Sequence, residues 1–183
     1  MWLLFDKSLQ ALTTTISDLA DVVQVARQPG REATETVDLA ALTEVLLQTL
    51  HPQVQEAAAT IETDFSGLPT LTYAPSSLRT ILLNLLTNTL KYRHPDRAPQ
   101  VLVRSYLAGQ QPVLEVQDNG LGLNLDLYGR ELFQLFRRFH TDVSEGTGVG
   151  LFLVNRLVRA EGGHIEVESQ EGQGTTFRVY LRG

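Results

Sequence analysis

The sequence predicts an α/β fold, because segments with apolar residues at helical spacing are interleaved with segments in which apolar and polar residues alternate. The clearest helical segment is 81–91, and the clearest alternating segments are 101–107, 113–117 and 175–181. With 183 residues, 43% of them hydrophobic, the chain is long enough for one ordinary domain with its own core and an appended helix.

Composition and charge exclude several classes of protein. The formal net charge is −6, so the chain as a whole is no electrostatic binder of nucleic acid, although local dipoles and a few cations can still bind a nucleotide. The lack of cysteine excludes disulfides, thiolate metal sites and cysteine nucleophiles. No apolar run in the sequence approaches the roughly 18 residues of a membrane span. We therefore expect no membrane contact and a cytoplasmic location, although a longer protein could carry a membrane anchor.

The first 30 residues predict a helix that packs against another helix, ended by Gln-Pro-Gly at 28–30. Eight apolar residues recur at alternating intervals of three and four, which is a heptad seam. They are Trp2, Phe5, Leu9, Leu12, Ile16, Leu19, Val23 and Ala26. The partner of this seam is either another chain, as in a homodimer through residues 2–26, or the domain that follows. We expect the helix to occupy 1–30 and the domain 31–183.

The domain is expected to open with a short strand and a helix. Residues 37–39 suggest the strand, and Asp38 is expected to cap the helix that runs over 39–50. Pro52, which cannot donate a backbone hydrogen bond, marks an irregularity before the helix resumes over 53–59.

A strand and a loop are expected next. The alternation over 60–65 is typical of a half-buried or edge strand. Residues 67–75 are expected to form a loop. We expect Leu68, Leu71 and Tyr73 to anchor this loop in the core.

Pro75 opens a helix that extends to about Tyr92, since proline is tolerated in a first helical turn. Its core stripe consists of Leu82, Leu85, Leu86 and Leu90. Asn84, Asn88 and Lys91 share another face, at positions i, i+4 and i+7. An amide oxygen suits Mg²⁺ and a lysine suits phosphate, so this face is a candidate ligand site. The alternative is an ordinary solvated face of an amphipathic helix.

The two alternating segments 101–107 and 113–117 predict a β-hairpin, which leads directly into Asp118-Asn119-Gly120-Leu121-Gly122. This pentapeptide is either a bare turn or a carboxylate aimed into a pocket, with glycines that let backbone approach a ligand. A carboxylate there can accept a hydrogen bond from an exocyclic amine such as that of adenine. The spacing of Asp118 and Asn119 fails the EF-hand pattern.

A segment rich in aromatic residues, 123–145, lies between two glycine-rich segments and is expected to form a lid on a short helix. It is followed by Gly146-Thr147-Gly148-Val149-Gly150-Leu151, a turn that opens a helix. Free N–H groups and the helix dipole make such a turn an anion site. A Walker loop is excluded because Gly-Lys-Ser/Thr is absent, and a dinucleotide fingerprint because position 151 is leucine.

The end of the chain predicts a helix and two strands. The helix is closed by Gly162-Gly163, a glycine C-cap. Strands are expected at 164–169 and 175–181, on either side of a tight turn at 171–174.

Four of these segments resemble, in order, the sequence boxes of the ATP-binding domain of bacterial sensor histidine kinases, within the GHKL or HATPase superfamily. They are 84–92 for the N box, 118–122 for the first glycine box, 132–139 for the F box and 146–151 for the second glycine box, with 172–177 as the closing turn. The resemblance covers 37–181. It implies a two-layer α/β sandwich, the Bergerat fold: a mixed sheet with three helices on one face, holding ATP between the N-box helix and a mobile lid.

The resemblance implies roles at the phosphate side of the site. Asn88 resembles the Mg²⁺ ligand, and Asn84 lies near the metal and phosphates. Lys91 and Tyr92 resemble the residues that flank the phosphates and the adenine side. Arg138 resembles a lid arginine that reaches the γ-phosphate, although the neighbouring Arg137 could do so instead.

It implies further roles at the adenine side and in the glycine segments. Asp118 resembles the acceptor for the adenine N6 amine, and Gly120 and Gly122 let the chain pass close to the base. The hinge and phosphate cradle are expected at Gly146, Thr147, Gly148, Val149, Gly150 and Leu151. One departure is Thr89, where the family usually has alanine; the extra hydroxymethyl group is expected to crowd the pocket slightly.

A larger departure concerns the phosphoacceptor. The family transfers a phosphoryl group to a histidine on a dimerising helix, and the sequence context of His51, His94, His140 and His164 does not fit that pattern. Residues 2–26 resemble the second helix of the family's dimerisation hairpin. The implied partners are therefore ATP, a His-containing dimerisation helix outside this chain and the receiver domain of a response regulator.

The residue at position 84 favours a kinase over a hydrolase. Gyrase-like members of the superfamily carry a glutamate there as the base that activates water, whereas an amide cannot take a proton from water near neutral pH. Two alternatives stay open: a serine kinase of the anti-sigma-factor type, and a nucleotide-gated binding module without transfer activity.

Overall fold

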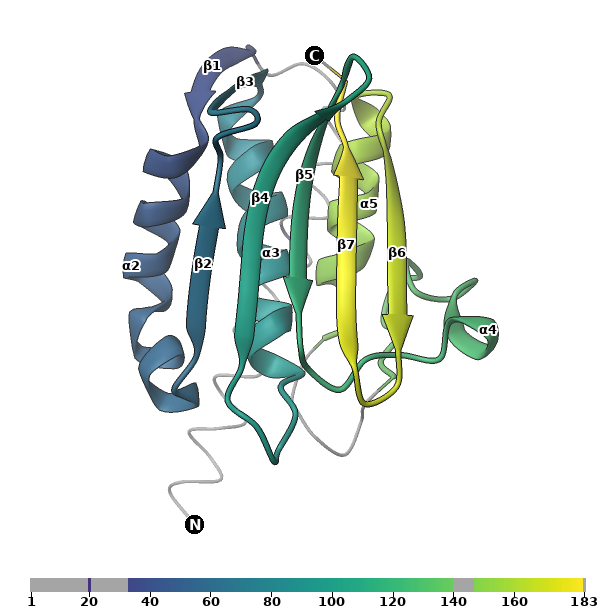
Figure 1. The fold of residues 1–183 in the computed structure, drawn as a ribbon. Coiled ribbons are helices and arrows are strands. Elements are labelled where there is room, and N and C mark those ends of the chain that lie inside the picture. Colours follow the sequence, from purple (N-terminus) through teal and green to yellow (C-terminus); the bar gives the residue numbers. More distant parts are fainter. Residues whose placement is uncertain (1–19, 21–32, 140–146, 183) are drawn as a thin grey trace.

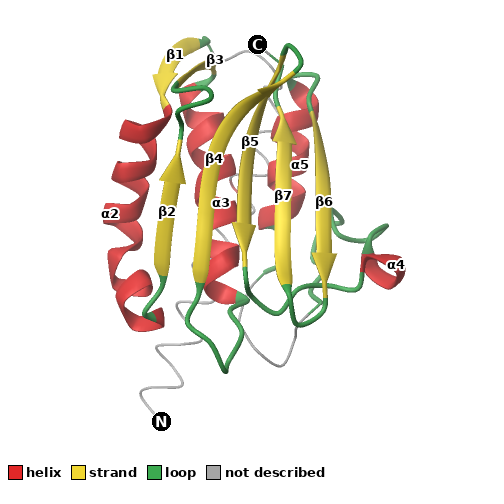
Figure 2. Ribbon diagram, viewed as in Figure 1, coloured by secondary structure: helices red, strands yellow, loops and turns green. Residues whose placement is uncertain are grey.

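The computed structural model describes Ala20 and residues 33–139 and 147–182. The predicted seam helix at 1–30 lies outside these residues except for Ala20. The described chain forms two layers, a five-stranded mixed sheet and a layer of helices on one of its faces (Figures 1 and 2). The two-layer α/β prediction is confirmed.

The sheet has the strand order β2-β4-β5-β7-β6. β2 pairs with β4 in parallel, and the remaining neighbours are antiparallel. The strands are β2 (Thr60–Asp64), β4 (Gln100–Ala108), β5 (Gln111–Asp118), β6 (His164–Gln170) and β7 (Gly174–Tyr180). The predicted hairpin is therefore β4 and β5, with Val101 opposite Asp118.

Three helices form the second layer: α2 (Leu39–Ala57), α3 (Pro75–Lys91) and α5 (Gly150–Ala160). The apolar stripe of the central helix α3 is completely buried, because α3 packs on the sheet and is flanked by α2 and α5. The buried stripe includes Leu78, Ile81, Leu82, Leu85, Leu86 and Leu90. The face of α3 with Asn84 and Asn88 is thereby turned away from the core.

The start of α2 agrees with the prediction from the sequence, whereas the middle of the helix does not. The side chain of Asp38 accepts a hydrogen bond from the Ala41 N–H at 2.9 Å, which confirms the predicted N-cap. The helix continues through Pro52 without the predicted break. Pro52 and Gln48 are both exposed, so water can satisfy the Gln48 carbonyl that loses its helical donor.

The predicted loop at 67–75 contains a strand, β3 (Thr70–Tyr73), which pairs antiparallel with β1 (Glu35–Asp38). The anchors Leu71 and Tyr73 are 4% and 2% exposed, as expected of core residues. The segment is a strand only because β1, far away in the sequence, lies beside it, and four residues give too little local signal to show this.

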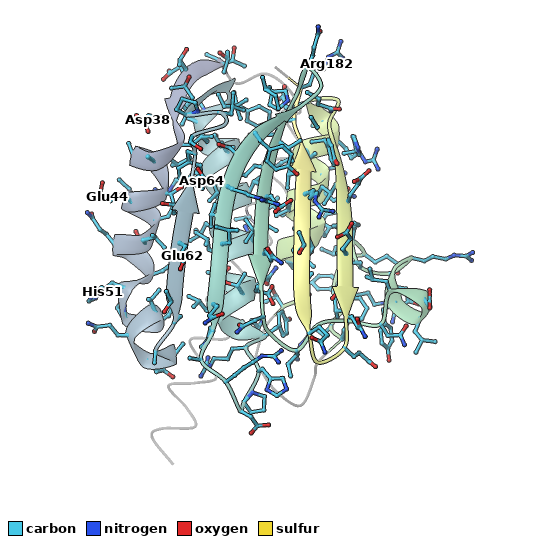
Figure 3. The ribbon with its side chains drawn as sticks, in the orientation of Figure 1. Asp38, Glu44, His51, Glu62, Asp64 and Arg182 are labelled. Carbon is cyan, nitrogen blue, oxygen red and sulfur yellow. The ribbon has the colours of Figure 1, made fainter. Side chains whose placement is uncertain are left out.

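The outer face of the sheet carries a network of charged residues rather than a helix in the described part of the chain (Figure 3). At its centre the buried carboxylate of Glu115 accepts hydrogen bonds from Arg104 Nε at 2.6 Å, Arg178 Nε at 2.7 Å and Tyr106 Oη at 3.0 Å. Burial raises the pKa of Glu115, but these three donors outweigh burial and hold the pKa below its usual value. The charged groups of this network are paired with one another, as expected on a sheet face that is exposed to solvent.

No helix in the described part of the chain is long and apolar enough to cross a membrane.

Candidate functional site

Four segments meet at one end of the sheet, where β5 ends and β7 begins (Figure 1). They are the C-terminal half of α3, the loop after Asp118, the turn between β6 and β7, and the loop between α3 and β4. The start of α5 lies against the same half of α3, where Gly150 adjoins Asn84. Hydrogen bonds join these segments: Leu121 N donates to Tyr92 O at 2.9 Å, and Gly172 N donates to Leu121 O at 2.7 Å. The structure thus brings together segments that are far apart in the sequence.

Asp118 supplies a partly buried carboxylate at the centre of this region. Its Oδ1 accepts hydrogen bonds from Gly120 N at 2.7 Å and Thr175 N at 3.3 Å. Burial raises the pKa of Asp118 to about 6, against the two backbone N–H groups and the charge of Arg97, which lower it. Within the described residues Oδ2 accepts no hydrogen bond, so it can receive one from a ligand amine.

The glycines after Asp118 allow very close packing of backbone. A Cβ on Gly120 would lie 2.5 Å from the Tyr92 carbonyl oxygen, and one on Gly122 would overlap the Gln170 carbonyl. Gly122 also has a φ of +64°, which L side chains rarely adopt. Gly174 is similarly constrained by the Asp118 carbonyl. These glycines bring the loop against the end of α3 and the β6–β7 turn, and so fix the position of Asp118.

The polar face of α3 lies against the start of α5. Asn84 Nδ2 donates to Thr80 O at 2.8 Å, and its Oδ1 is so placed that a Cβ on Gly150 would come within 2.6 Å of it. Asn88 is half-buried, and its side chain makes no hydrogen bond to another described residue. The Asn84 amide oxygen therefore lies next to the start of α5, and Asn88 follows one turn later on the same face of α3; amide oxygens of this kind can bind a divalent cation.

The residues around Asn88 complete this face. The Lys91 ammonium lies 5.2 Å from the centre of the Tyr92 ring, so the helix ends with a cation held beside an aromatic ring. Thr89 is buried, and its hydroxyl donates to the Leu86 carbonyl at 2.8 Å within the helix. The hydroxyl of Thr89 is thus satisfied inside α3.

The first turn of α5 is an uncapped helix N-terminus. Val149 occupies the N-cap position and provides no side-chain hydrogen bond, so the N–H groups of the first helical turn receive no cap from it. Gly148, with a φ of +72°, turns the chain into the helix next to Thr147. Of the six predicted cradle residues, Gly146 lies outside the described residues. Such a helix start favours an anion.

The described part of the predicted lid contains one short helix, α4 (Leu125–Tyr128), capped by Asn124. Leu132 is buried, and Phe139 packs on Tyr128 with ring centres 5.2 Å apart. Phe136 is 54% exposed and has a φ of +63°, while its N–H donates to the Gly148 carbonyl at 3.0 Å. The lid is thereby joined to the turn that precedes α5.

The two lid arginines differ in their surroundings. Arg137 is exposed and ion-paired with Glu131 at 3.2 Å. Arg138 is half-buried and also has an interaction partner. Its main-chain neighbour Arg137 packs against Gly148, since a Cβ on that glycine would lie 2.6 Å from the Arg137 carbonyl oxygen. Both arginines therefore adjoin the backbone contact between the lid and Gly148.

Two residues of the site were not predicted. Thr175 donates its N–H to Asp118; it lies within the closing turn 172–177, but its residue type gave no signal for this role. Arg97 donates to three backbone carbonyls, those of Asn119, Gly120 and Gly172, at 2.6, 2.9 and 2.6 Å. No sequence signal identified it, because an arginine in a proline-containing loop is usually solvated.

The donor set suits a nucleotide with its metal. A carboxylate with a free oxygen, an uncapped helix start and a neutral amide oxygen match an exocyclic amine, phosphates and a divalent cation, respectively. No cluster of three or more histidine, aspartate and glutamate residues occurs in the described ranges. A cation here would therefore depend on phosphate oxygens as well as on Asn88.

Comparison with known proteins finds matches in both sequence and structure. The model of the family described as "Histidine kinase-, DNA gyrase B-, and HSP90-like ATPase" matches residues 73–183. The circadian input-output histidine kinase CikA of Synechococcus elongatus is 31% identical over 176 residues, which are 93% of this chain and 23% of that protein. The sensor histidine kinase ZraS of Escherichia coli is 31% identical over 176 residues, 96% of this chain and 36% of that protein. This chain therefore spans only a part of these relatives.

Solved structures show the same fold. Full-length ShkA in complex with AMPPNP has a TM-score of 0.80 and 26% identity, over 97% of this chain and 37% of that one. The Acinetobacter baumannii histidine kinase AdeS has a TM-score of 0.76 at 22% identity, over 97% of this chain and 82% of that one.

Proposed function

Because the chain belongs to the family of histidine kinase-, DNA gyrase B- and HSP90-like ATPases, we propose that it binds Mg-ATP as the catalytic domain of a sensor histidine kinase. The observation that carries the proposal is the placement of Asp118, whose Oδ2 accepts no hydrogen bond within the described residues, in a loop that is bonded to the end of α3 through Leu121 N and the Tyr92 carbonyl. Asn88 lies on this half of α3, and the uncapped start of α5 packs against the same helix at Asn84. One end of this region suits adenine and the other suits phosphates and a cation. ATP, when bound, supplies the γ-phosphoryl group that is transferred.

The adenine end selects the base. The Oδ2 atom of Asp118 accepts the N6–H of adenine, while Oδ1 stays bonded to the N–H groups of Gly120 and Thr175. A charged acceptor in a partly buried site gives a stronger hydrogen bond than a neutral one. Tyr92, held at the end of α3, and Gly122 border the base on this account.

The phosphate end orients the reacting group. The N–H groups of Gly150 and Leu151 bind phosphate oxygens together with Lys91, and Asn88 holds Mg²⁺. Arg138, or Arg137 in its place, reaches the γ-phosphate from the lid. Phosphoryl transfer depends mostly on positioning and on charge stabilisation, which these groups provide.

Position 84 favours transfer to a protein acceptor over hydrolysis. Asn84 donates to the Thr80 carbonyl through its own amide and cannot accept a proton from water near neutral pH. It therefore orients groups near the metal and phosphates, and the acceptor supplies its own nucleophile.

The histidines of the described region do not suit the role of acceptor. His51 lies exposed on α2 (Figure 3), and His164 is stacked on Tyr180 with ring centres 4.4 Å apart. His94 lies beside Asp96 in a loop, its Nδ1 accepting the Asp96 N–H at 3.2 Å. His140 lies outside the described residues. We infer that the acceptor histidine belongs to a separate dimerisation helix, from which a response regulator receives the phosphoryl group.

The proposed division of the chain places a partial dimerisation helix at 1–30 and the ATP-binding domain at 31–183. The strand β1 begins at Glu35 and pairs with β3, which supports a domain start soon after residue 30, whereas the family match covers residues 73–183 and does not bear on this boundary.

Titration of the chain with ATP tests the role of Asn88. Calorimetry with Mg²⁺, and again with EDTA, is expected to show that Asn88→Ala abolishes most of the gain in affinity that Mg²⁺ gives the wild type. The exposed amide of Gln48 on α2 provides the matched control, Gln48→Ala. A Mg²⁺ gain of equal size in Asn88→Ala and the wild type would contradict the assignment of the metal ligand.

A further inference from the structure

The loop between α3 and β4 holds an exposed arginine that binds the backbone of the loops at the adenine end of the site. Arg97 is exposed, and its guanidinium donates to backbone carbonyls of two different loops: Asn119 and Gly120 after β5, and Gly172 in the β6–β7 turn. Along the chain these acceptors lie 22, 23 and 75 residues away. One side chain therefore ties together three of the segments that form the site.

The contact with Asn119 reaches Asp118 through a single peptide group. The Asn119 carbonyl that accepts from Arg97 Nε at 2.6 Å belongs to the same peptide plane as the Gly120 N–H, which donates to Asp118 Oδ1 at 2.7 Å. A cation on the oxygen of an amide polarises it and strengthens the bond made by its N–H. Arg97 thus acts on the carboxylate both by orienting this peptide and by polarising it.

Resting on the function proposed above, we propose that Arg97 is a positioning residue of the adenine site. It holds the Asn119–Gly120 peptide so that Asp118 keeps Oδ1 occupied by backbone and presents a charged Oδ2 to the base. Arg97 makes no contact with the base in this account. Its effect on nucleotide binding passes through Asp118.

The pKa of Asp118 also indicates that Arg97 acts on this carboxylate. Burial raises the pKa of Asp118, and the charge of Arg97 counteracts it. The segments packed around Asp118 also carry Lys91, Arg93, His94, Asp96 and Glu171. Within the described part of the chain, Arg97 is the charged side chain that noticeably affects the pKa of Asp118. Removal of Arg97 is therefore expected to raise that pKa further.

The loop is fixed by a second set of contacts that do not involve Arg97. Asn119 Oδ1 accepts from Gln100 N at 2.9 Å, and Asn119 Nδ2 donates to Ala98 O at 3.1 Å. Leu121 N still donates to the Tyr92 carbonyl. Variants of Arg97 should consequently fold, so that the role of its charge can be tested separately from the fold.

The test uses Arg97→Gln, which removes the charge, and Arg97→Lys, which keeps the charge but lacks the planar group that reaches three carbonyls. Arg182→Gln, at an exposed arginine at the opposite end of the sheet, is the matched control (Figure 3). Carboxyl NMR of the nucleotide-free chain, with Asp118→Asn to assign the signal, measures the Asp118 pKa. Calorimetry from pH 5 to 8 measures ATP affinity.

We expect Arg97→Gln to raise the Asp118 pKa and to weaken ATP binding at pH 7 about tenfold, as for the loss of one hydrogen bond to a charged group. Arg97→Lys should restore the pKa toward that of the wild type but only part of the affinity, and Arg182→Gln should change neither. An unchanged Asp118 pKa in Arg97→Gln would overturn the proposal, whatever the affinity. A wild-type chain that binds no ATP would instead overturn the proposed function, while the NMR measurement would still decide the effect of Arg97 on Asp118.

Discussion

Replacing Asp118 by asparagine should weaken ATP binding without harming the fold. Asparagine keeps one oxygen for the Gly120 and Thr175 N–H groups, but then it turns an NH₂ group toward the N6 amine of adenine, so that two donors face each other. Loss of a hydrogen bond to a charged acceptor costs about 1.5–3 kcal/mol. This corresponds to a loss of affinity of about 10- to 150-fold, at 1.4 kcal/mol per factor of ten.

Although Asp118→Asn should weaken ATP binding, it should not lower the stability of the free domain and should even raise it. Burial raises the pKa of Asp118 from 3.8 to about 6, so the charged form is disfavoured in the folded state. The stability that this group contributes is fully present below its unfolded pKa and is lost as the pH rises through about 6. A shift of about two units is worth about 3 kcal/mol at most, and Asp118→Asn should recover part of it at pH 7.

Two measurements on one pair of proteins check both directions. Calorimetry from pH 5 to 8 should show the ratio of wild-type to variant ATP affinity falling as the pH drops below 6, because Asp118 is then protonated. The ratio removes the titration of ATP itself. Urea unfolding at pH 7 should show the variant to be at least as stable as the wild type. Glu62→Gln, which removes an exposed carboxylate on β2, is the control (Figure 3). Equal ATP affinity in wild type and Asp118→Asn would refute the assignment, and a loss of affinity together with lower stability would refute the physical argument.

Two further predictions concern the lid and the first helix. Amide exchange across 133–139 should slow when ATP and Mg²⁺ saturate the chain, because the exposed Phe136 and its neighbours then dock on nucleotide-bound protein; identical exchange with and without nucleotide would contradict a lid. The seam at residues 2–26 should cause weak self-association, so sedimentation should show larger species for the whole chain than for one that starts at Arg31. If both sediment as monomers at high concentration, the helix docks on its own domain instead.

The parts of the fold that a short stretch of sequence encodes were predictable. The apolar stripe of α3, the alternation of β4 and β5 and the Asp38 cap follow from local periodicity and hydrogen-bonding chemistry. β3 was not predictable, because its pairing with β1 connects segments more than 30 residues apart and its four residues carry little signal of their own. The passage of α2 through Pro52 depended on solvent exposure, which the sequence does not state.

The same division holds for the site. Asp118, Asn84 and the glycine turn were identified as candidates because their residue types and spacing are unusual for their elements. Thr175 and Arg97 act through backbone groups: one donates its own N–H, and the other binds three carbonyls. Every residue has a backbone carbonyl and every residue except proline has a backbone N–H, so contacts of this kind leave almost no trace in the sequence and emerge only when the loops are placed side by side.

The central claim is that the chain positions ATP for transfer to a histidine that it does not itself supply. The most direct measurement incubates the chain with γ-labelled ATP and Mg²⁺, with and without a separate fragment bearing the family's His-containing dimerisation helix. The account predicts negligible labelling and very slow hydrolysis by the chain alone, and an acid-labile, base-stable label on the added fragment. Acid-stable labelling of the chain or of a partner would favour a serine kinase. Fast hydrolysis with no labelled protein would mean that a group other than Asn84 activates water, and would contradict the mechanism proposed here.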